Sequence, residues 1–353
     1  MKNSTLAVFL NLGESFASLG GQAELMISQN IAAFAKAFKR IYVFTYNQES
    51  VKLPPNCILI TPPRPLHRYL YALLLPFIHG RIIRQCQVLR CFQLSGTVPA
   101  IVAKLIYGSK FVFNYGYDYA AFARLEGKAL QARSFSLLSL VAVKFAAGVI
   151  VKNKGLKIKG HYLPNGVDIH QFAPKPKSNS KIKTVLFIGR LEPQKNLAIL
   201  LTALAQAKRK LKIIFVGQGS QKQILISQAK TLKLNLTIRD NLTHSQLPKL
   251  YQSTDVFVLP SLIEGSPKVL LEAMACGLPV VATAVPGITE IIKSKVTGVL
   301  VKPTVAGLTS GINYVLSHPQ QARRLGIFAR RRIQAEFGIT QVMNQEIAIL
   351  KSV

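Results

Sequence analysis

Short apolar runs alternate with segments of helical periodicity along the whole chain. In the first half these runs are 6–10, 41–45, 57–60, 88–92, 111–114 and 148–151. A second series consists of 184–188, 213–216, 255–259 and 280–283. Strands that alternate with helices are typical of a parallel sheet covered on both faces, so the pattern predicts two doubly wound α/β domains in tandem.

The composition changes between the two series. Residues 172–181 lack periodicity and are rich in proline, serine and lysine, which indicates a linker. The expected parts are an N-terminal, acceptor-binding Rossmann-like domain over 1–172, a linker over 173–181, a C-terminal Rossmann-like domain over 182–332 and a helix over 333–353. This final helix is expected to break near Gly338 and to pack back on the N-terminal domain.

The chain is strongly basic. Forty-five Lys and Arg residues oppose 14 Asp and Glu residues, and the formal net charge is +31. Such a surface attracts polyanions, among them nucleic acid, anionic lipid and phosphorylated substrates. No nucleic-acid-binding motif accompanies the charge, so a specific nucleic-acid partner is not expected.

The segment from Arg64 to Arg90 combines arginines with Leu, Tyr, Phe and Ile, and no acidic residue occurs between Glu49 and Asp118. Two interpretations fit this segment. It is either a membrane-surface helix that favours anionic lipids, or a pair of core helices with solvated arginines.

Four cysteines, at 57, 86, 91 and 276, form no CxxC pair, and no Cys/His cluster has the spacing of a metal site. The chain begins without a secretory pattern, and no stretch has the pattern of a clean transmembrane helix. These features favour a reducing compartment, no structural metal and no cofactor. We therefore expect a cytoplasmic protein, either free or peripheral on the inner face of the cell membrane.

The segment from Glu264 to Glu272 carries the clearest chemistry. Gly265 permits close approach of the backbone to a ligand, and Pro267 suits the first turn of a helix, where its missing N–H costs nothing. The free amides of that turn and the helix dipole favour an anion, for which a diphosphate is a natural guest. Glu272 lies about two turns into an otherwise apolar helix, so it needs a partner, which ribose hydroxyls would supply.

Further candidate residues follow other predicted strands. Gly189 and Arg190 end one strand, and Gly217 and Gly219 end another. The carboxyl ends of parallel strands meet at one edge of a sheet, so these residues are expected to converge with Glu264 on one crevice.

Positive charge near a leaving diphosphate would assist its departure. Arg190 and Lys195 supply this charge, and negative charge grows on the diphosphate as the glycosyl bond breaks. Aspartates stand only at 118, 168, 240 and 255, so no DxD pair is present. A metal-bridged diphosphate is therefore not expected.

The second half resembles the donor domain of family 4 of the retaining glycosyltransferases, which have the GT-B fold. The matching stretches are Phe187–Leu191, Lys195–Asn196, Phe215–Gly219, Asp255–Ser261, the E-x7-E element of 264–272 and Ala273–Ala282. The first half matches more weakly, through Gly20, Gly21 and Glu24. The resemblance implies two Rossmann-like domains that face a central cleft, and sugar transfer with retention of configuration.

The resemblance also implies roles for individual residues. Glu264 would contact hydroxyls of the donor sugar, Glu272 would bind the ribose, and Arg190 and Lys195 would bind the diphosphate. The other implied donor-binding positions are Gly20, Gly21, Gly189, Gly217, Gly265, Ser266, Pro267, Lys268 and Val269.

The acceptor side departs from the family pattern. Family members often have a histidine after a late strand of the N-terminal domain, and Tyr115 occupies that place here. Tyrosine is a poor base near neutral pH, so a catalytic histidine is not expected. Asp118 is a candidate for orienting the acceptor, while packing alone would also explain Tyr115.

Together these features predict a metal-independent, retaining glycosyltransferase that moves a sugar from a nucleoside-diphosphate sugar to a glycan or lipid-linked acceptor. A GT-B enzyme that hydrolyses or epimerises its sugar nucleotide is a second hypothesis. A basic nucleic-acid-binding protein is a third.

Overall fold

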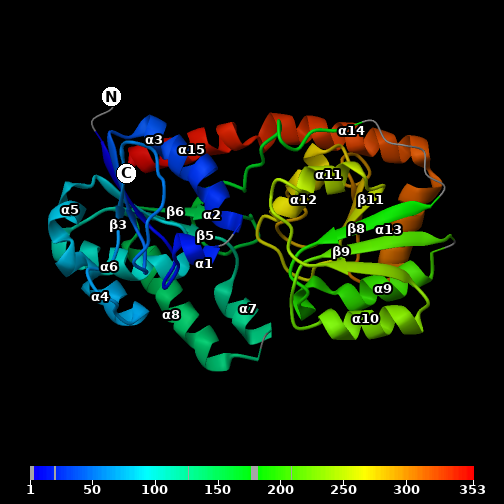
Figure 1. Ribbon diagram of the computed structural model, residues 1–353, viewed down its shortest axis with the longest axis horizontal. Coiled ribbons are helices and arrows are strands. Elements are labelled where there is room, and N and C mark those ends of the chain that lie inside the picture. The colour runs from blue at the N-terminus through cyan, green and yellow to red at the C-terminus, as the bar shows by residue number, and fades with distance from the viewer. Residues whose placement is uncertain (1–3, 20, 126, 176–181, 208) are drawn as a thin grey trace. The chain divides into compact units, whose positions relative to one another are not determined.

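The computed structural model describes residues 4–19, 21–125, 127–175, 182–207 and 209–353, and Figure 1 shows its helices and strands. Most of the predicted linker, residues 176–181, and the predicted donor-loop residue Gly20 lie outside the described residues. The chain divides into two compact units. The first comprises 1–164 with 342–353, and the second comprises 165–341.

The first unit is built on a parallel sheet, which has seven strands among the described residues. Their order is β3-β2-β1-β4-β5-β6-β7. The strands are β1 Thr5–Phe9, β2 Arg40–Phe44, β3 Cys57–Ile60, β4 Val88–Cys91, β5 Phe111–Tyr115, β6 Gly148–Val151 and β7 His161–Tyr162. The order reverses between β1 and β4, and such a reversal opens a crevice at the carboxyl ends of the strands.

Helices cover both faces of this sheet. In Figure 1, α3 and α15 lie on the upper side of the unit, and α4, α6 and α8 lie on the lower side. The helical elements are α1 Phe16–Leu19, α2 Gly21–Leu25, the π-helix η1 Met26–Ile31, α3 Ala32–Ala37, α4 Arg68–Ile78, α5 Gly80–Gln85, the 3₁₀ turn η2 Leu94–Gly96, α6 Thr97–Tyr107, α7 Tyr119–Leu125, α8 Ala129–Phe145 and α15 Ile339–Ser352.

A buried ion pair joins the end of the chain to the first sheet. Arg90 on β4 is fully buried, and its Nε donates to Oε1 of Glu346 on α15 at 2.6 Å. Glu346 is also buried, and Arg90 donates a second hydrogen bond to the Cys91 carbonyl. Removing one partner would leave an uncompensated charge in the core, so the pair fixes α15 against β4.

The second unit has a parallel sheet of six strands within the described ranges, in the order β10-β9-β8-β11-β12-β13. The strands are β8 Lys183–Ile188, β9 Leu211–Val216, β10 Asn235–Arg239, β11 Val256–Leu259, β12 Val280–Thr283 and β13 Val299–Val301. The helical elements are the 3₁₀ turn η3 Pro193–Lys195, α9 Leu197–Ala205, α10 Lys222–Thr231, α11 Leu247–Gln252, α12 Lys268–Ala275, α13 Val305–Ser317 and α14 Pro319–Glu336. The order reverses between β8 and β11, so the loops after these two strands border the crevice of this sheet.

The apolar runs of the sequence become strands of both sheets, and the predicted α/β class with doubly wound parallel sheets is confirmed. The helical pattern near the end of the chain differs from the prediction. The helix that contains residue 333 begins earlier, at Pro319, and a new helix starts at Ile339. Val167 separates the two, since its N–H donates to the Phe337 carbonyl and its carbonyl accepts from Ile339.

No helix in the described ranges combines the length and the apolarity needed to cross a membrane.

Candidate functional site

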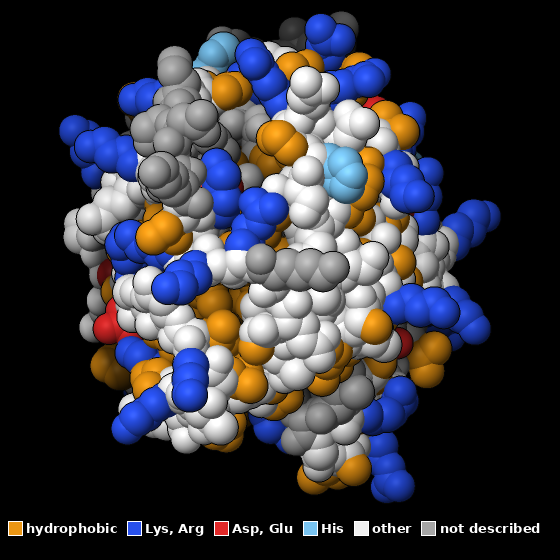
Figure 2. Space-filling view, turned by 90° about the vertical axis from the view of Figure 1, so that its right-hand side faces the viewer, with side chains coloured by type: hydrophobic (Ala, Val, Ile, Leu, Met, Phe, Trp, Pro, Cys, Tyr) orange, Lys and Arg blue, Asp and Glu red, His pale blue; other side chains and the backbone are white. Residues whose placement is uncertain are grey.

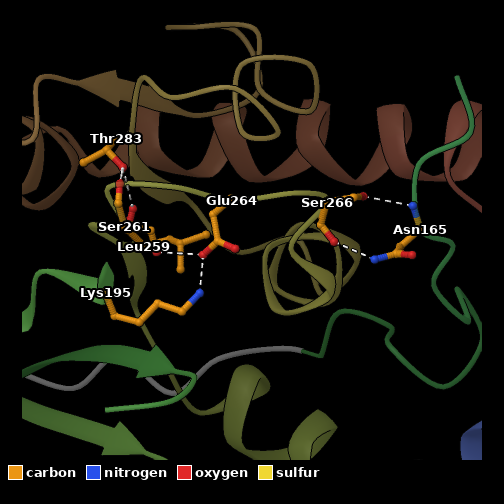
Figure 3. A network of polar contacts seen from close by, with 7 residues as sticks. All are labelled: Asn165, Lys195, Leu259, Ser261, Glu264, Ser266 and Thr283. Carbon is orange, nitrogen blue, oxygen red and sulfur yellow. Dashed lines mark hydrogen bonds and ion pairs between the residues drawn. The ribbon is translucent and has the colours of Figure 1, made fainter. Parts of the chain in front are cut away.

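The loop after β11 holds a carboxylate in a defined position. Glu264 Oε1 accepts a hydrogen bond from Ser261 Oγ at 2.7 Å and lies 2.5 Å from Lys195 Nζ (Figure 3). The side chain of Glu264 is 10 % exposed and that of Lys195 is 16 % exposed. A pair so well shielded from water is stronger than a surface pair, and neither side chain is fully buried.

The loops after β8 and β11 are also joined through their backbones. Leu262 N–H donates to the Gln194 carbonyl at 2.8 Å. Asn196 ends the short turn Pro193–Lys195 with a φ of 56°, a left-handed conformation that asparagine tolerates. The structure therefore brings Lys195 and Glu264 together from the two loops that border the reversal of strand order.

Two glycines allow backbone segments to meet at this edge. At Gly217, with φ 144°, an added Cβ would lie 2.0 Å from the Gly189 carbonyl oxygen. At Gly287, with φ 84°, an added Cβ would lie 2.2 Å from the Gly265 carbonyl oxygen. Both glycines are thus required by close packing between loops, and Gly287 was not among the predicted site residues.

Asn165 forms two hydrogen bonds with Ser266, just before the start of α12. The backbone N–H of Asn165 donates to Ser266 Oγ at 2.9 Å, and its side-chain amide donates to the Ser266 carbonyl at 2.6 Å. Pro267 is the residue before the helix rather than within its first turn, which opens with Lys268. Lys268 is exposed and Val269 is half-buried. The backbone N–H groups of both residues lie in the first turn, where N–H groups have no acceptor within the helix.

Glu272 is buried on α12 and has protein partners on both oxygens. Tyr251 OH donates to Oε2 at 2.9 Å, and His244 Nε2 lies 3.2 Å from Oε1. The ring of His244 packs edge-on against Phe172. Burial, followed by the charge of Glu272, raises the pKa of Tyr251 well above its ordinary value, so this phenol stays protonated and donates.

The sequence predicted Glu272 but neither His244 nor Tyr251. Each carboxylate oxygen can accept more than one hydrogen bond, so protein partners and ribose hydroxyls are compatible. Nothing in the local pattern around His244 or Tyr251 signals this contact, because they lie 28 and 21 residues away in the chain.

The remaining donor-side candidates occupy the same edge of the second sheet. Gly189 follows β8 directly, and Arg190 comes next as an exposed residue. Gly265 lies between the fixed Glu264 and Ser266. Gly21 belongs to the first unit, where it opens α2.

The two acceptor-side candidates have structural partners within the first unit. Tyr115 ends β5 and is buried, and its hydroxyl lies 3.3 Å from Ser139 Oγ. Burial is the main cause that raises its pKa, which makes the phenol a still weaker base at neutral pH. Asp118 Oδ1 accepts from the Ala121 N–H at 2.8 Å and so caps the start of α7.

Within the residues that the structure describes, no three His, Cys, Asp or Glu side chains gather in a way that could hold a metal ion. The four cysteines are free thiols. Burial raises the pKa of Cys86 and of Cys91 to about 12.

Two doubly wound parallel sheets, each with a reversal of strand order, define the GT-B class of folds. Solved structures agree over the full chain. The sucrose-phosphate synthase of Thermosynechococcus elongatus matches with a TM-score of 0.83 and 21 % identity, covering 99 % of both chains. Anabaena HepE, in complex with UDP-glucose, matches with a TM-score of 0.77 and 22 % identity, covering 99 % of this chain and 100 % of that one.

Residues 168–332 match the family model of glycosyl transferases group 1. A glycogen synthase of Mycobacterium tuberculosis is 32 % identical over 182 residues, which are 49 % of this chain and 44 % of the relative. A D-inositol 3-phosphate glycosyltransferase of Segniliparus rotundus is 31 % identical over 182 residues, which are 46 % of this chain and 40 % of the relative. The aligned region thus spans less than half the length of these two relatives.

Proposed function

We propose that this protein is a retaining glycosyltransferase that moves a sugar from a nucleoside-diphosphate sugar to a glycan or lipid-linked acceptor without a metal ion. One observation carries the proposal. The Lys195–Glu264 pair lies just before α12 at the carboxyl edge of the second sheet, and the buried Glu272 lies on the same helix. This arrangement suits a nucleoside-diphosphate sugar. The cation and the helix start suit the diphosphate, and the buried carboxylate suits the ribose.

The donor would be held by parts with separate tasks. Amides at the start of α12 would bind the phosphates, and Glu272 would accept from the ribose hydroxyls. Glu264 would accept from hydroxyls of the sugar. Its contact with Lys195 keeps the cation in place before substrate arrives, so little reorganisation is needed during the reaction.

The chemical step would then depend on charge. As the bond between the sugar and the diphosphate breaks, negative charge moves onto the leaving phosphate. Lys195 and Arg190 would stabilise that charge more in the transition state than in the ground state. The acceptor would attack from the same face, with Asp118 or Tyr115 as candidates for orienting it.

A uridine nucleotide is the first donor to test, because HepE was solved in complex with UDP-glucose. The protein would work in the cytoplasm, and a lipid-linked acceptor would bring it to the inner face of the membrane. The exposed arginines of the acid-free segment, at positions 64, 68, 81 and 84, support that placement.

The test is a transfer assay with UDP-glucose and other sugar nucleotides, together with thermal-shift screening against UDP, GDP and ADP. A nucleotide present at one hundred times its dissociation constant adds about 2.7 kcal/mol of apparent stability. Glu264→Ala and Arg190→Ala should each lose transfer while the protein stays folded. Full activity in both variants would reject the assignment.

The same assays separate the alternatives. Release of free sugar with no acceptor requirement would favour a hydrolase or epimerase of this fold. Selective binding to one nucleic-acid sequence at physiological salt would favour a nucleic-acid-binding protein. Weak binding that falls steeply with salt would follow from the net charge of +31 alone.

A further inference from the structure

Helix α4 is apolar on its outer face as well as on its inner face. Tyr71, Ala72 and Leu75 are buried against the first unit. The opposite face is exposed, and its residues are Tyr69 at 54 %, Leu70 at 48 %, Leu73 at 51 %, Leu74 at 37 %, Phe77 at 60 % and Ile78 at 41 %. A surface helix normally presents polar residues to water, so an apolar outer face indicates an interaction surface.

Two neighbouring helices continue the apolar surface. Helix α6 contacts both α4 and α8, and Figure 1 shows the three on the same side of the first unit. The exposed residues of α6 are Leu105 and Ile106, and those of α8 are Leu130, Leu137 and Leu140. Eleven of the 19 exposed large hydrophobic residues in the described part of the chain lie on these three helices, so they are concentrated rather than scattered.

Cations accompany the apolar residues. On α8, Arg133 and Lys144 are exposed at helical spacing from the leucines, and Arg68 opens α4 with its guanidinium over the Tyr69 ring. Arg64, Arg81 and Arg84 are also exposed, while no acidic residue occurs from 50 to 117. Basic residues are spread over other faces too, as Figure 2 shows for the second unit. The outer faces of α4, α6 and α8 differ in combining these cations with most of the exposed large hydrophobic residues of the described chain.

We propose that the outer faces of α4, α6 and α8 form a docking surface for an anionic lipid bilayer. A bilayer offers negative headgroups above an apolar layer, which matches cations interspersed with leucine, phenylalanine and tyrosine. A second copy of the chain fits less well, because a symmetric contact would place the same cations against one another. This surface names the residues that would hold the protein at the membrane. It rests on the proposed function only for the reason why the protein would bind there.

The experiment is co-sedimentation of the full-length protein with vesicles. One set contains phosphatidylcholine alone, and the other contains phosphatidylcholine and phosphatidylglycerol. The wild type should bind the anionic vesicles and scarcely bind the neutral ones. Leu73→Glu combined with Phe77→Glu should weaken anionic-vesicle binding by about tenfold or more, because it removes apolar contact and adds repulsion.

A matched control changes two exposed isoleucines on α10 of the second unit, Ile224→Glu and Ile226→Glu, which are 62 % and 43 % exposed. This control adds the same charge and should retain at least most of the binding. Equal losses in both double variants, or no binding of the wild type to anionic vesicles, would overturn the proposal. A concentration-dependent dimer that the α4 variant abolishes would also overturn it, since the surface would then belong to a second copy.

A second readout separates this proposal from the proposed function. The thermal shift produced by UDP should be unchanged in the α4 variant, which also shows that the variant is folded. Loss of vesicle binding with an intact UDP shift supports the docking surface. Vesicle binding by a wild type that shows no nucleotide shift would leave the surface standing and count against the glycosyltransferase assignment.

Discussion

Replacing Lys195 with methionine removes the cation that contacts Glu264 and keeps most of the side-chain volume. Two effects are expected. If Lys195 binds the leaving diphosphate as proposed, its removal costs a charge-assisted hydrogen bond worth about 1.5–3 kcal/mol, so kcat/KM should fall roughly tenfold to 150-fold. The folded state loses an ion pair whose members are 16 % and 10 % exposed.

The stability cost should be smaller than that of a fully buried pair. Removing one member of such a pair costs about 3–5 kcal/mol. Glu264 keeps its hydrogen bond from Ser261 and retains some access to water, so we expect about 1–2 kcal/mol. For the second unit, this lowers the melting temperature by roughly 2–8 °C. Activity should therefore be measured well below the transition.

The matched control is Lys183→Met. Lys183 also pairs with a carboxylate, since its Nζ lies 3.4 Å from Asp255 Oδ1. It lies at the amino end of β8, whereas the candidate site lies at the carboxyl ends of the strands. Steady-state kinetics with a sugar nucleotide should show unchanged kcat/KM for this control. If Lys195→Met matched the wild type, or if both variants lost activity equally, the reasoning about the leaving group would be wrong.

Three further outcomes follow from the packing. Gly287→Ala should lower stability by about 1–3 kcal/mol and weaken nucleotide binding, because its Cβ would meet the backbone of the loop after β11; unaltered melting and titration curves would contradict this. Tyr251→Phe should weaken UDP binding measured by calorimetry while the fold persists, because Glu272 loses the donor that orients it; a wild-type affinity would show that this donor is dispensable. Glu346→Ala should destabilise the protein by about 3–5 kcal/mol in urea unfolding, because Arg90 is left buried and unpaired; a loss below about 1 kcal/mol would show that water reaches it.

Much of the fold follows from the sequence because its strands are buried and apolar. Runs such as Thr184–Ile188 and Val280–Thr283 form inner strands of the second sheet and show as almost entirely apolar segments. The edge strand β10 was not predicted, and its residues alternate between exposed and half-buried. An edge strand has fewer neighbours, so its pattern is weaker than that of a central strand.

The boundary of α14 was missed for a different reason. Its first half is rich in arginine and glutamine and has a narrow apolar stripe, so the periodicity was clear only near Ile333. The break before Ile339 lies where the sequence predicted it, near Gly338. Its hydrogen bonds with Val167, which lies far away in the chain, are not contained in any local pattern.

The candidate site divides in the same way. Glu264, Lys195 and Glu272 stand out because charged residues border apolar strands and helices. The contacts of Glu272 with His244 and Tyr251, and of Gly287 with Gly265, join segments that meet only after folding. The charged members of the candidate site were therefore predicted from the sequence, whereas the residues that contact them became apparent only in the structure.

The central claim is that the carboxyl edge of the second sheet binds a nucleoside diphosphate. A crystal structure of the protein with UDP would test it most directly. We expect the diphosphate at the start of α12 beside Lys195 and Arg190, with the ribose on Glu272. A UDP molecule bound elsewhere, with this edge empty at saturating nucleotide, would contradict the account.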